Sequence, residues 1–248
     1  MKRITSTNYF AQSGLRTLAV EVDPKLHALI VGRRREILNT IMNDTVTNIY
    51  FPSPLLVQNW KPKEDSGAPT LPFYMKIYIT GEPADTIKAR DLLLALAAEK
   101  KANLKIRSVT CLPRKIDWML INRKDELKKI MYDNAVFISL PPLGNQSNFV
   151  SVYGDDPVYV ERAVRAFMLL AAEFYIAYLQ LATNVFALNG PSSGTNLINQ
   201  IVPALCDIIQ SSRAEVVFKA SYVEIYGLEA ATKMAFKQLT AVHSIEVC

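Results

Sequence analysis

Hydrophobic and polar positions follow the same order three times along this chain of 248 residues. Each copy begins with a strand pattern, in which apolar residues alternate with polar ones. A stretch with apolar residues at i, i+3 and i+4 follows, as in Leu38, Ile41 and Met42, and predicts a helix with one face against a sheet. Two further strand patterns and a long helix complete each copy. The predicted order is β-α-β-β-α, with room for a short extra helix after the first strand.

Equal spacings show that these copies are an internal repeat. Gly81, Gly154 and Gly227 end the third strand pattern of each copy and stand 73 residues apart. In the upstream halves, a proline stands 17 residues before an apolar pair in every copy. These pairs are Pro24 with Ile41-Met42, Pro113 with Ile130-Met131, and Pro191 with Ile208-Ile209. Agreement at both places indicates three copies of one supersecondary unit.

The alignment of the copies gives the expected strands and domain limits. The first strands are expected at Thr17–Val22, Leu104–Cys111 and Asn184–Leu188, and the second at Asn48–Phe51, Ala135–Leu140 and Ala214–Phe218. We therefore expect an α+β fold of three tandem units, 1–101, 102–181 and 182–248. Each unit is a three-stranded sheet covered on one face by helices. The linkers are short, so neighbouring units are expected to pack against each other.

Two segments depart from the common pattern. Ala166–Leu188 is a nearly continuous apolar run, as a membrane span also requires, but Glu173 and Gln180 interrupt it. Because the repeat needs a strand at its end, we expect a helix through about Leu181, then a strand, and no membrane span. Ser53–Pro72 in the first unit is rich in Pro, Lys, Asp, Ser and Gly, so we expect a mobile loop.

Composition and charge are those of a folded, weakly basic protein. Hydrophobic residues make up 50% of the chain and charged residues 21%, which favours packed cores over disorder. The net charge of +5 is compatible with a polyanionic partner but is too small to identify one. Three cysteines without CxxC spacing favour free thiols in a reducing compartment. With a polar segment at Met1–Phe10, we expect a cytoplasmic or nuclear location.

The sequence contains no strong residue pattern of a catalytic site or a metal site. His27 and His243 have no second His or Cys at i+3 or i+4, which favours structural roles. The Gly190–Gly194 loop lacks the Lys and Ser/Thr of a phosphate-binding P-loop. No nucleophile with its base and no pair of carboxylates stands out. We expect no catalytic residue, metal site, cofactor or enzymatic activity.

The run IVGRRREILNTIMNDTVTNIYFP, Ile30–Pro52, resembles the first half of a type I KH domain. Gly32 begins a four-residue loop, and Leu38 and Ile41 follow it by six and nine positions. A strand with a proline, ending at Pro52, completes the match. The run IYITGEPADTIKARDLLL resembles the third strand, glycine and last helix of the same family. The tandem arrangement is similar to that of vigilin-like and Bicaudal-C-like proteins.

The resemblance implies binding of single-stranded RNA, because KH domains hold about four nucleotides with a GxxG loop on the backbone. No unit here keeps both glycines: the loops are Gly32-Arg33-Arg34-Arg35, Ile121-Asn122-Arg123-Lys124 and Asn199-Gln200-Ile201-Val202. We expect the basic loop of the first unit to contact phosphate directly, together with Asn122, Arg123 and Lys124 of the second. The apolar Ile201 and Val202 predict no RNA binding by the third unit.

An alternative function stays open. A run of charge at a helix N-terminus is often only solvated surface, and the fold is then a scaffold for a protein partner or for self-association. Basic residues at that end oppose the helix dipole, which favours a role beyond local stability.

The aromatic residues of the first unit are a weaker candidate site. Tyr50, Phe51, Phe73, Tyr74 and Tyr78 have the ring systems that stack on bases. Aromatic residues in strands more often fill the core, so we expect these five in the core.

Overall fold

The computed structural model describes residues 14–56, 72–180, 205–219 and 222–241. Several expected features lie outside the described residues: most of the loop Ser53–Pro72, the strand Asn184–Leu188, the loops Gly190–Gly194 and Asn199–Val202, and His243. The described chain divides into two compact parts, residues 1–168 and 169–248.

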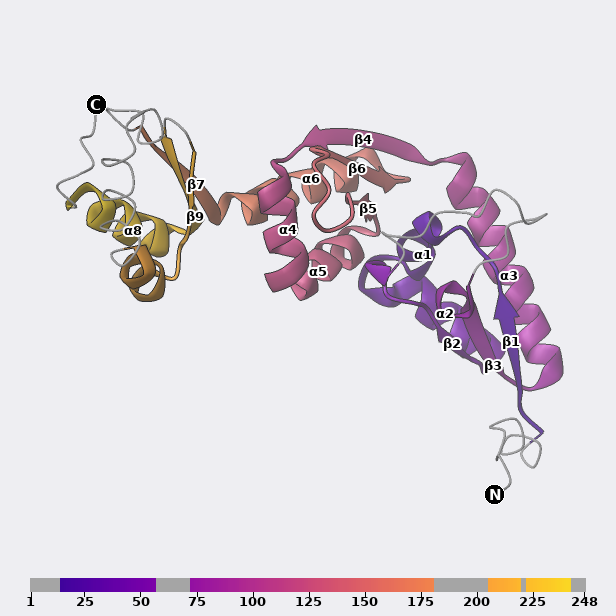
Figure 1. Ribbon diagram of the computed structural model, residues 1–248. Helices are drawn as coiled ribbons and strands as arrows, with labels where there is room; N and C mark the ends of the chain where they lie inside the picture. Colours follow the sequence, from indigo (N-terminus) through magenta and orange to yellow (C-terminus); the bar gives the residue numbers. More distant parts are fainter. Residues whose placement is uncertain (1–13, 57–71, 181–204, 220–221, 242–248) are drawn as a thin grey trace, which may run out of the picture. The chain divides into compact units, whose positions relative to one another are not determined.

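Three antiparallel sheets of three strands each form the framework (Figure 1). In every sheet the third strand lies between the first and the second, in the orders β1-β3-β2, β4-β6-β5 and β7-β9-β8. The strands are β1 (Arg16–Val20), β2 (Asn48–Tyr50), β3 (Ile77–Gly81), β4 (Lys105–Thr110), β5 (Phe137–Ser139), β6 (Phe149–Gly154), β7 (Phe174–Gln180), β8 (Glu215–Phe218) and β9 (Tyr222–Leu228). The expected α+β class and three-stranded sheets are confirmed.

The helices also repeat. They are α1 (Pro24–Val31), α2 (Glu36–Thr45), α3 (Pro83–Ala102), α4 (Pro113–Asn122), α5 (Lys124–Asn134), α6 (Pro157–Ala172) and α8 (Glu229–Ala241), with the 3-10 turns η1 (Arg33–Arg35) and η3 (Phe73–Met75). Residues 205–212 are helical as well. The first unit runs from β1 to α3, and the second unit from β4 to α6. The extra helix expected after the first strand is α1 in the first unit and α4 in the second. The third unit comprises β7 to α8.

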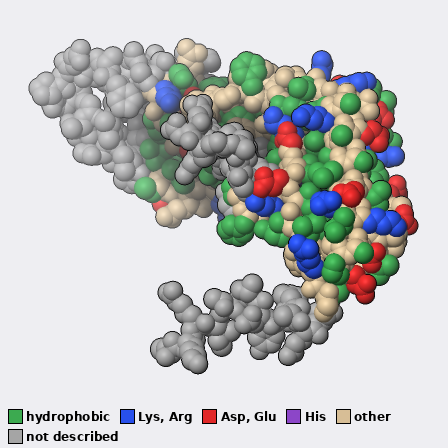
Figure 2. Space-filling view, turned by 90° about the vertical axis from the view of Figure 1, so that its right-hand side faces the viewer, with side chains coloured by type: hydrophobic (Ala, Val, Ile, Leu, Met, Phe, Trp, Pro, Cys, Tyr) green, Lys and Arg blue, Asp and Glu red, His purple; other side chains and the backbone are tan. Residues whose placement is uncertain are grey.

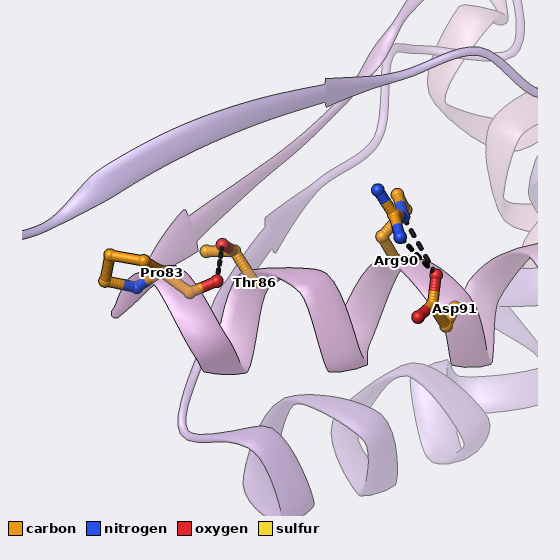
Figure 3. A network of polar contacts seen from close by, with 4 residues as sticks. All are labelled: Pro83, Thr86, Arg90 and Asp91. Carbon is orange, nitrogen blue, oxygen red and sulfur yellow. Dashed lines mark hydrogen bonds and ion pairs between the residues drawn. The ribbon is translucent and has the colours of Figure 1, made fainter.

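Prolines set the helix starts, because their missing N–H is not needed in a first turn. Pro24 and Pro113 follow the first strands of their units and open α1 and α4. At α1 the Asp23 carboxylate accepts a hydrogen bond from the Lys25 N–H at 3.0 Å. Figure 3 shows the start of α3, where the Thr86 hydroxyl donates to the Pro83 carbonyl at 2.9 Å, and farther along Arg90 pairs with Asp91.

The first core lies between β1-β3-β2 and helices α1, α2 and α3. Ile77 and Ile79 of the central strand are fully buried there, and Leu38 and Ile41 of the predicted stripe pack on the same cluster. The second unit buries Leu127 and Met131, which correspond to Leu38 and Met42 of the first. The stripes therefore face the sheets, as their spacing predicts.

The repeat glycines sit where each central strand ends, and at Gly81 and Gly154 a side chain would clash with a neighbouring residue. A Cβ on Gly154 would lie 2.6 Å from Val160 Cγ2, and one on Gly81 would lie 2.8 Å from Thr47 Cγ2. At Gly227 the nearest atom, Ala231 Cβ, is 3.3 Å away. Each of the three glycines pairs with the beginning of the first strand of its unit. This common position supports the repeat, and close packing explains the residue type.

A second common position confirms the upstream alignment. Val46, Ala135 and Arg213 each follow the helix before the second strand and have φ of +48°, +49° and +60°. The numbers of residues that separate them along the chain equal those that separate Pro24, Pro113 and Pro191. Glycine usually occupies such left-handed helix ends, so the three units share a strained backbone turn.

The apolar run around residues 166–180 differs from the expectation. The helix expected through Leu181 ends at Ala172, and the first strand of the third sheet is Phe174–Gln180, so the helical assignment was wrong. Tyr, Ile and Phe favour strands, and β7 gives β9 its second neighbour through seven residue pairs. The third sheet thus begins before residue 181, while the limits 1–101, 102–181 and 182–248 stay a prediction. Within the described ranges no helix is long and apolar enough to cross a membrane.

Gly154→Ala is expected to lower the free energy of unfolding by about 1–3 kcal/mol, because the added methyl must displace Val160 or the strand end. Gly227→Ala is the matched control, since its methyl meets only a contact that a small shift relieves. Thermal melting of the two variants tests this, and equal melting temperatures would contradict the close-packing explanation.

Candidate nucleic-acid interface

A groove of about 460 Å³ lies along the first unit, between α2 and β2. Its lining residues are Val31, Arg35, Leu38, Met42, Asn48, Ile49, Tyr50, Phe51 and Tyr132. The walls are mostly apolar, and the lining residues with polar side chains are Arg35, Asn48 and the two tyrosines. Such a site accepts a flat, partly apolar ligand next to a negative charge.

The basic loop joins α1 to α2 in a tight turn. Gly32 has φ +72°, and a Cβ there would lie 2.9 Å from Ile37 Cδ1, so only glycine fits without a shift. Arg34 and Arg35 also have positive φ, +52° and +63°. The Arg35 N–H donates to the Gly32 carbonyl at 3.2 Å and closes the turn. Two arginines therefore hold a conformation that glycine adopts at lower cost.

The three arginines of this loop are exposed, as expected, but their surroundings differ. The Arg33 guanidinium lies over the ring of Tyr159 in α6, 4.1 Å from its centroid. Arg35 lines the groove, and Arg34 lies between them in the turn. Arg33 thus links the loop to the second unit, while Arg35 is the arginine at the groove.

The loop of the second unit is built differently. Helix α4 ends at Asn122 and α5 begins at Lys124, so Arg123 alone separates them. The Arg123 guanidinium donates to the Glu126 carboxylate at 2.9 Å and lies 5.5 Å from the Trp118 ring centroid. The Asn122 amide donates to the Trp118 carbonyl at 3.1 Å. Lys124 is exposed at the first position of α5.

The first and second units pack against each other, which confirms the expectation for this pair. Helix α5 contacts η1 and α1, as the ribbon shows beside the basic loop (Figure 1). Met75 of the first unit packs on Phe137 of the second. The Lys100 ammonium and the Asp155 carboxylate form a half-buried ion pair of 2.6 Å.

Two aromatic residues expected in the core are exposed instead. Tyr50 is 64% exposed and Phe73 is 74% exposed, so the core assignment was wrong for both. Tyr50 alternates with the buried Ile49 along β2 and therefore points away from the core. Phe51 and Tyr78 are partly buried, and the side chain of Tyr74 is outside the description.

His27 has the structural role expected for it. Its ring is buried, its Nε2 lies 3.1 Å from the Val22 carbonyl oxygen, and its edge packs on Phe51. Burial lowers the pKa of His27 to about 4, so the ring is neutral near pH 7. In the part of the chain that the structure describes, no cluster of His, Cys, Asp and Glu could hold a metal ion.

Positive charge does not dominate the face that carries α3. Figure 2 shows Lys and Arg side chains there interspersed with Asp, Glu and hydrophobic ones. A surface of both signs offers no continuous track for a polyanion.

Two family models match the chain. The model described as KHD4 second KH domain matches residues 14–103, and the Mug60/KHD4 KH type I domain matches residues 106–175. The two segments contain the first and second sheets and together cover more than half of the chain. This chain is a tandem KH-domain protein. KH domains are nucleic-acid-binding modules.

The relatives of this tandem KH protein are much longer than the chain itself. K homology domain-containing protein 4 of Mycosarcoma maydis is 38% identical over 237 residues, which are 94% of this chain and 17% of the relative. Vigilin of Mus musculus is 30% identical over 159 residues, which are 63% of this chain and 11% of the relative. The chain therefore spans less than a fifth of either relative.

Solved structures resemble this KH protein only loosely. A structure described as KH domains is 17% identical, with a TM-score of 0.24, over 91% of this chain and 61% of that chain. Dim2p from Pyrococcus horikoshii OT3 is 17% identical, with a TM-score of 0.23, over 63% of this chain and 90% of that chain.

Within the KH frame, the groove is formed by the loop, α2 and β2 of the first KH unit. Gly32 and Arg35 are the first and fourth residues of the GxxG position, and Arg35 has a left-handed backbone, which glycine adopts more readily. The second KH unit has no such turn, because its chain passes from α4 to α5 through one residue of φ −129°. The sequence predicted the loop but not Tyr132. This residue directly follows Met131 of the apolar stripe, and no sequence pattern distinguishes it as a groove residue.

Arg35→Gly is expected to raise the free energy of unfolding by up to about 1 kcal/mol, because glycine relieves the positive φ. Arg35→Ala removes the same charge and keeps the strained backbone, so it should give no gain. Melting curves of the two variants provide the test. Equal stability of both would show that the loop is not strained at Arg35.

Proposed function

We propose that this KH array binds single-stranded RNA through the groove of its first unit. The observation that carries the proposal is the position of Arg35, which lines a largely apolar groove together with Tyr50 and Tyr132. Phosphate requires a positive donor, and an unstacked base requires an apolar or aromatic surface. The groove of the first unit offers both within one site.

Arg34 and Arg35 are the proposed phosphate contacts. In a GxxG loop, glycine lets backbone N–H groups approach phosphate closely. The side chains of Arg34 and Arg35 prevent such an approach, but a guanidinium binds phosphate through two parallel hydrogen bonds. Binding should consequently be salt-sensitive and only weakly selective for sequence at the phosphate positions.

Arg33 takes a different part in this proposal. Its stacking on Tyr159 makes it a contact between units, so it holds the loop rather than the ligand. Lys124 and Asn122 of the second unit stay candidate RNA contacts. Arg123 is a weaker candidate, because its ion pair with Glu126 must compete with phosphate.

One observation favours a protein-binding scaffold as a second candidate function. The outer face of the second sheet exposes Ile106 of the edge strand β4 and Phe149 of β6, by 61% and 66%. Exposed apolar side chains on an edge strand are typical of surfaces that pair with another chain.

Replacing Arg34 and Arg35 together by Gln should weaken RNA binding on the order of tenfold, because two charge-assisted contacts are lost. The slope of log affinity against log salt should become shallower by about 1.4, at about 0.7 per phosphate contact on a single strand. Fluorescence anisotropy with a short random single-stranded RNA at several salt concentrations measures both quantities. Melting should not change, since both side chains are exposed.

The matched control is Lys88→Gln with Lys101→Gln, which removes the same net charge from exposed positions of α3. It should leave the salt slope close to that of the wild type. Wild-type affinity and slope in the arginine variant, with an unchanged melting curve, would refute the proposed RNA contact. Absence of RNA binding at low salt together with dimer formation would favour the scaffold.

A further inference from the structure

Tyr132 belongs to the second unit but lines the groove of the first. The other eight described residues that line the groove belong to the first unit. Tyr132 lies near the C-terminal end of α5, is partly buried, and packs on the hydrophobic core of the first unit. The groove is therefore incomplete without the second unit.

The position of Tyr132 depends on buried residues of α5 and on contacts between the two units. The neighbouring Leu127 and Met131 are fully buried and anchor α5 in its own unit. The stacking of Arg33 on Tyr159 and the packing of Met75 on Phe137 join the two units around α5. A side chain anchored in this way can meet a ligand without a large loss of conformational entropy.

The chemistry of Tyr132 suits a nucleobase. Burial raises the pKa of its hydroxyl, against the opposing effect of the nearby Arg35 charge, so the hydroxyl is protonated at neutral pH and can donate a hydrogen bond. Its ring offers an aromatic surface within reach of the same Arg35 that is the proposed phosphate contact. Stacking of a base on such a ring is independent of charge.

We propose that Tyr132 of the second unit contacts a base of single-stranded RNA in the groove of the first unit and helps set the nucleotide preference there. This inference rests on the proposed RNA binding by that groove. The two units then form one binding body, and the first unit alone lacks part of its base-contacting surface.

A simple packing role makes a different prediction. If Tyr132 only fills the space between the units, its loss lowers stability and leaves the preference among bases unchanged. Tyr132→Leu separates the two roles, because leucine keeps apolar volume but cannot stack or donate a hydrogen bond. Tyr132→Phe restores the ring without the hydroxyl.

The experiment measures binding of the full chain to labelled hexanucleotide RNA pools in which one position is fixed as A, C, G or U. Tyr132→Leu should weaken binding on the order of tenfold and flatten the preference at one position. The salt slope should not change, since no charge is lost. Tyr132→Phe should recover most of the affinity.

Tyr153→Leu is the matched control, because it makes the same change and keeps apolar volume at a residue that packs on Met75 and Phe137 but does not line the groove. It should keep the base preference of the wild type. An unchanged preference in Tyr132→Leu, or an equal loss in both variants, overturns this inference while RNA binding that depends on Arg34 and Arg35 still stands. A wild-type chain that binds no RNA overturns the proposed function and the inference together.

Discussion

The contact between helix α5 and the basic loop Gly32–Arg35 determines what the first unit can offer to a ligand. On one side of the contact, Arg33 is held over Tyr159, so one of three neighbouring charges is committed to the second unit. On the other side, Tyr132 extends the wall of the groove next to Arg35. A single interface between two KH units thus divides the charge of the loop and completes the site. An array of independent units would have neither property.

This arrangement of the basic loop requires strained backbone conformations, which lower stability. Arg34 and Arg35 occupy left-handed conformations that cost non-glycine residues roughly 1–2 kcal/mol each. Such strain persists where the surrounding structure fixes it, and here the buried α2 on one side and α5 on the other do so. The turn exposes two arginine side chains where the chain enters α2.

Much of this fold follows from local pattern, because its repeat is specified by short-range features. Gly81 and Gly154 mark tight packing at strand ends, Pro24 and Pro113 open helices, and helical spacing locates the stripes. The end of helix α6 was misplaced because FYIAYLQ is as apolar as the helix before it, and only pairing with β9 makes it a strand. Tyr50 was misplaced since periodicity cannot tell which face of a short strand meets solvent. Tyr132 depends on a contact between units, which no local pattern encodes.

In the proposed RNA binding, the loop of the second unit is a weaker phosphate contact than the loop of the first. Its loop has one non-helical residue, and Arg123 must leave both Glu126 and the Trp118 ring before it can bind phosphate. An exposed pair of this kind is worth about 1 kcal/mol or less, so phosphate could displace it, but the net gain would be small. The same unit nevertheless provides Tyr159, Phe137 and Tyr132 to the first. Its contribution to the proposed RNA binding is consequently greater through the surface it shares with the first unit than through a loop of its own.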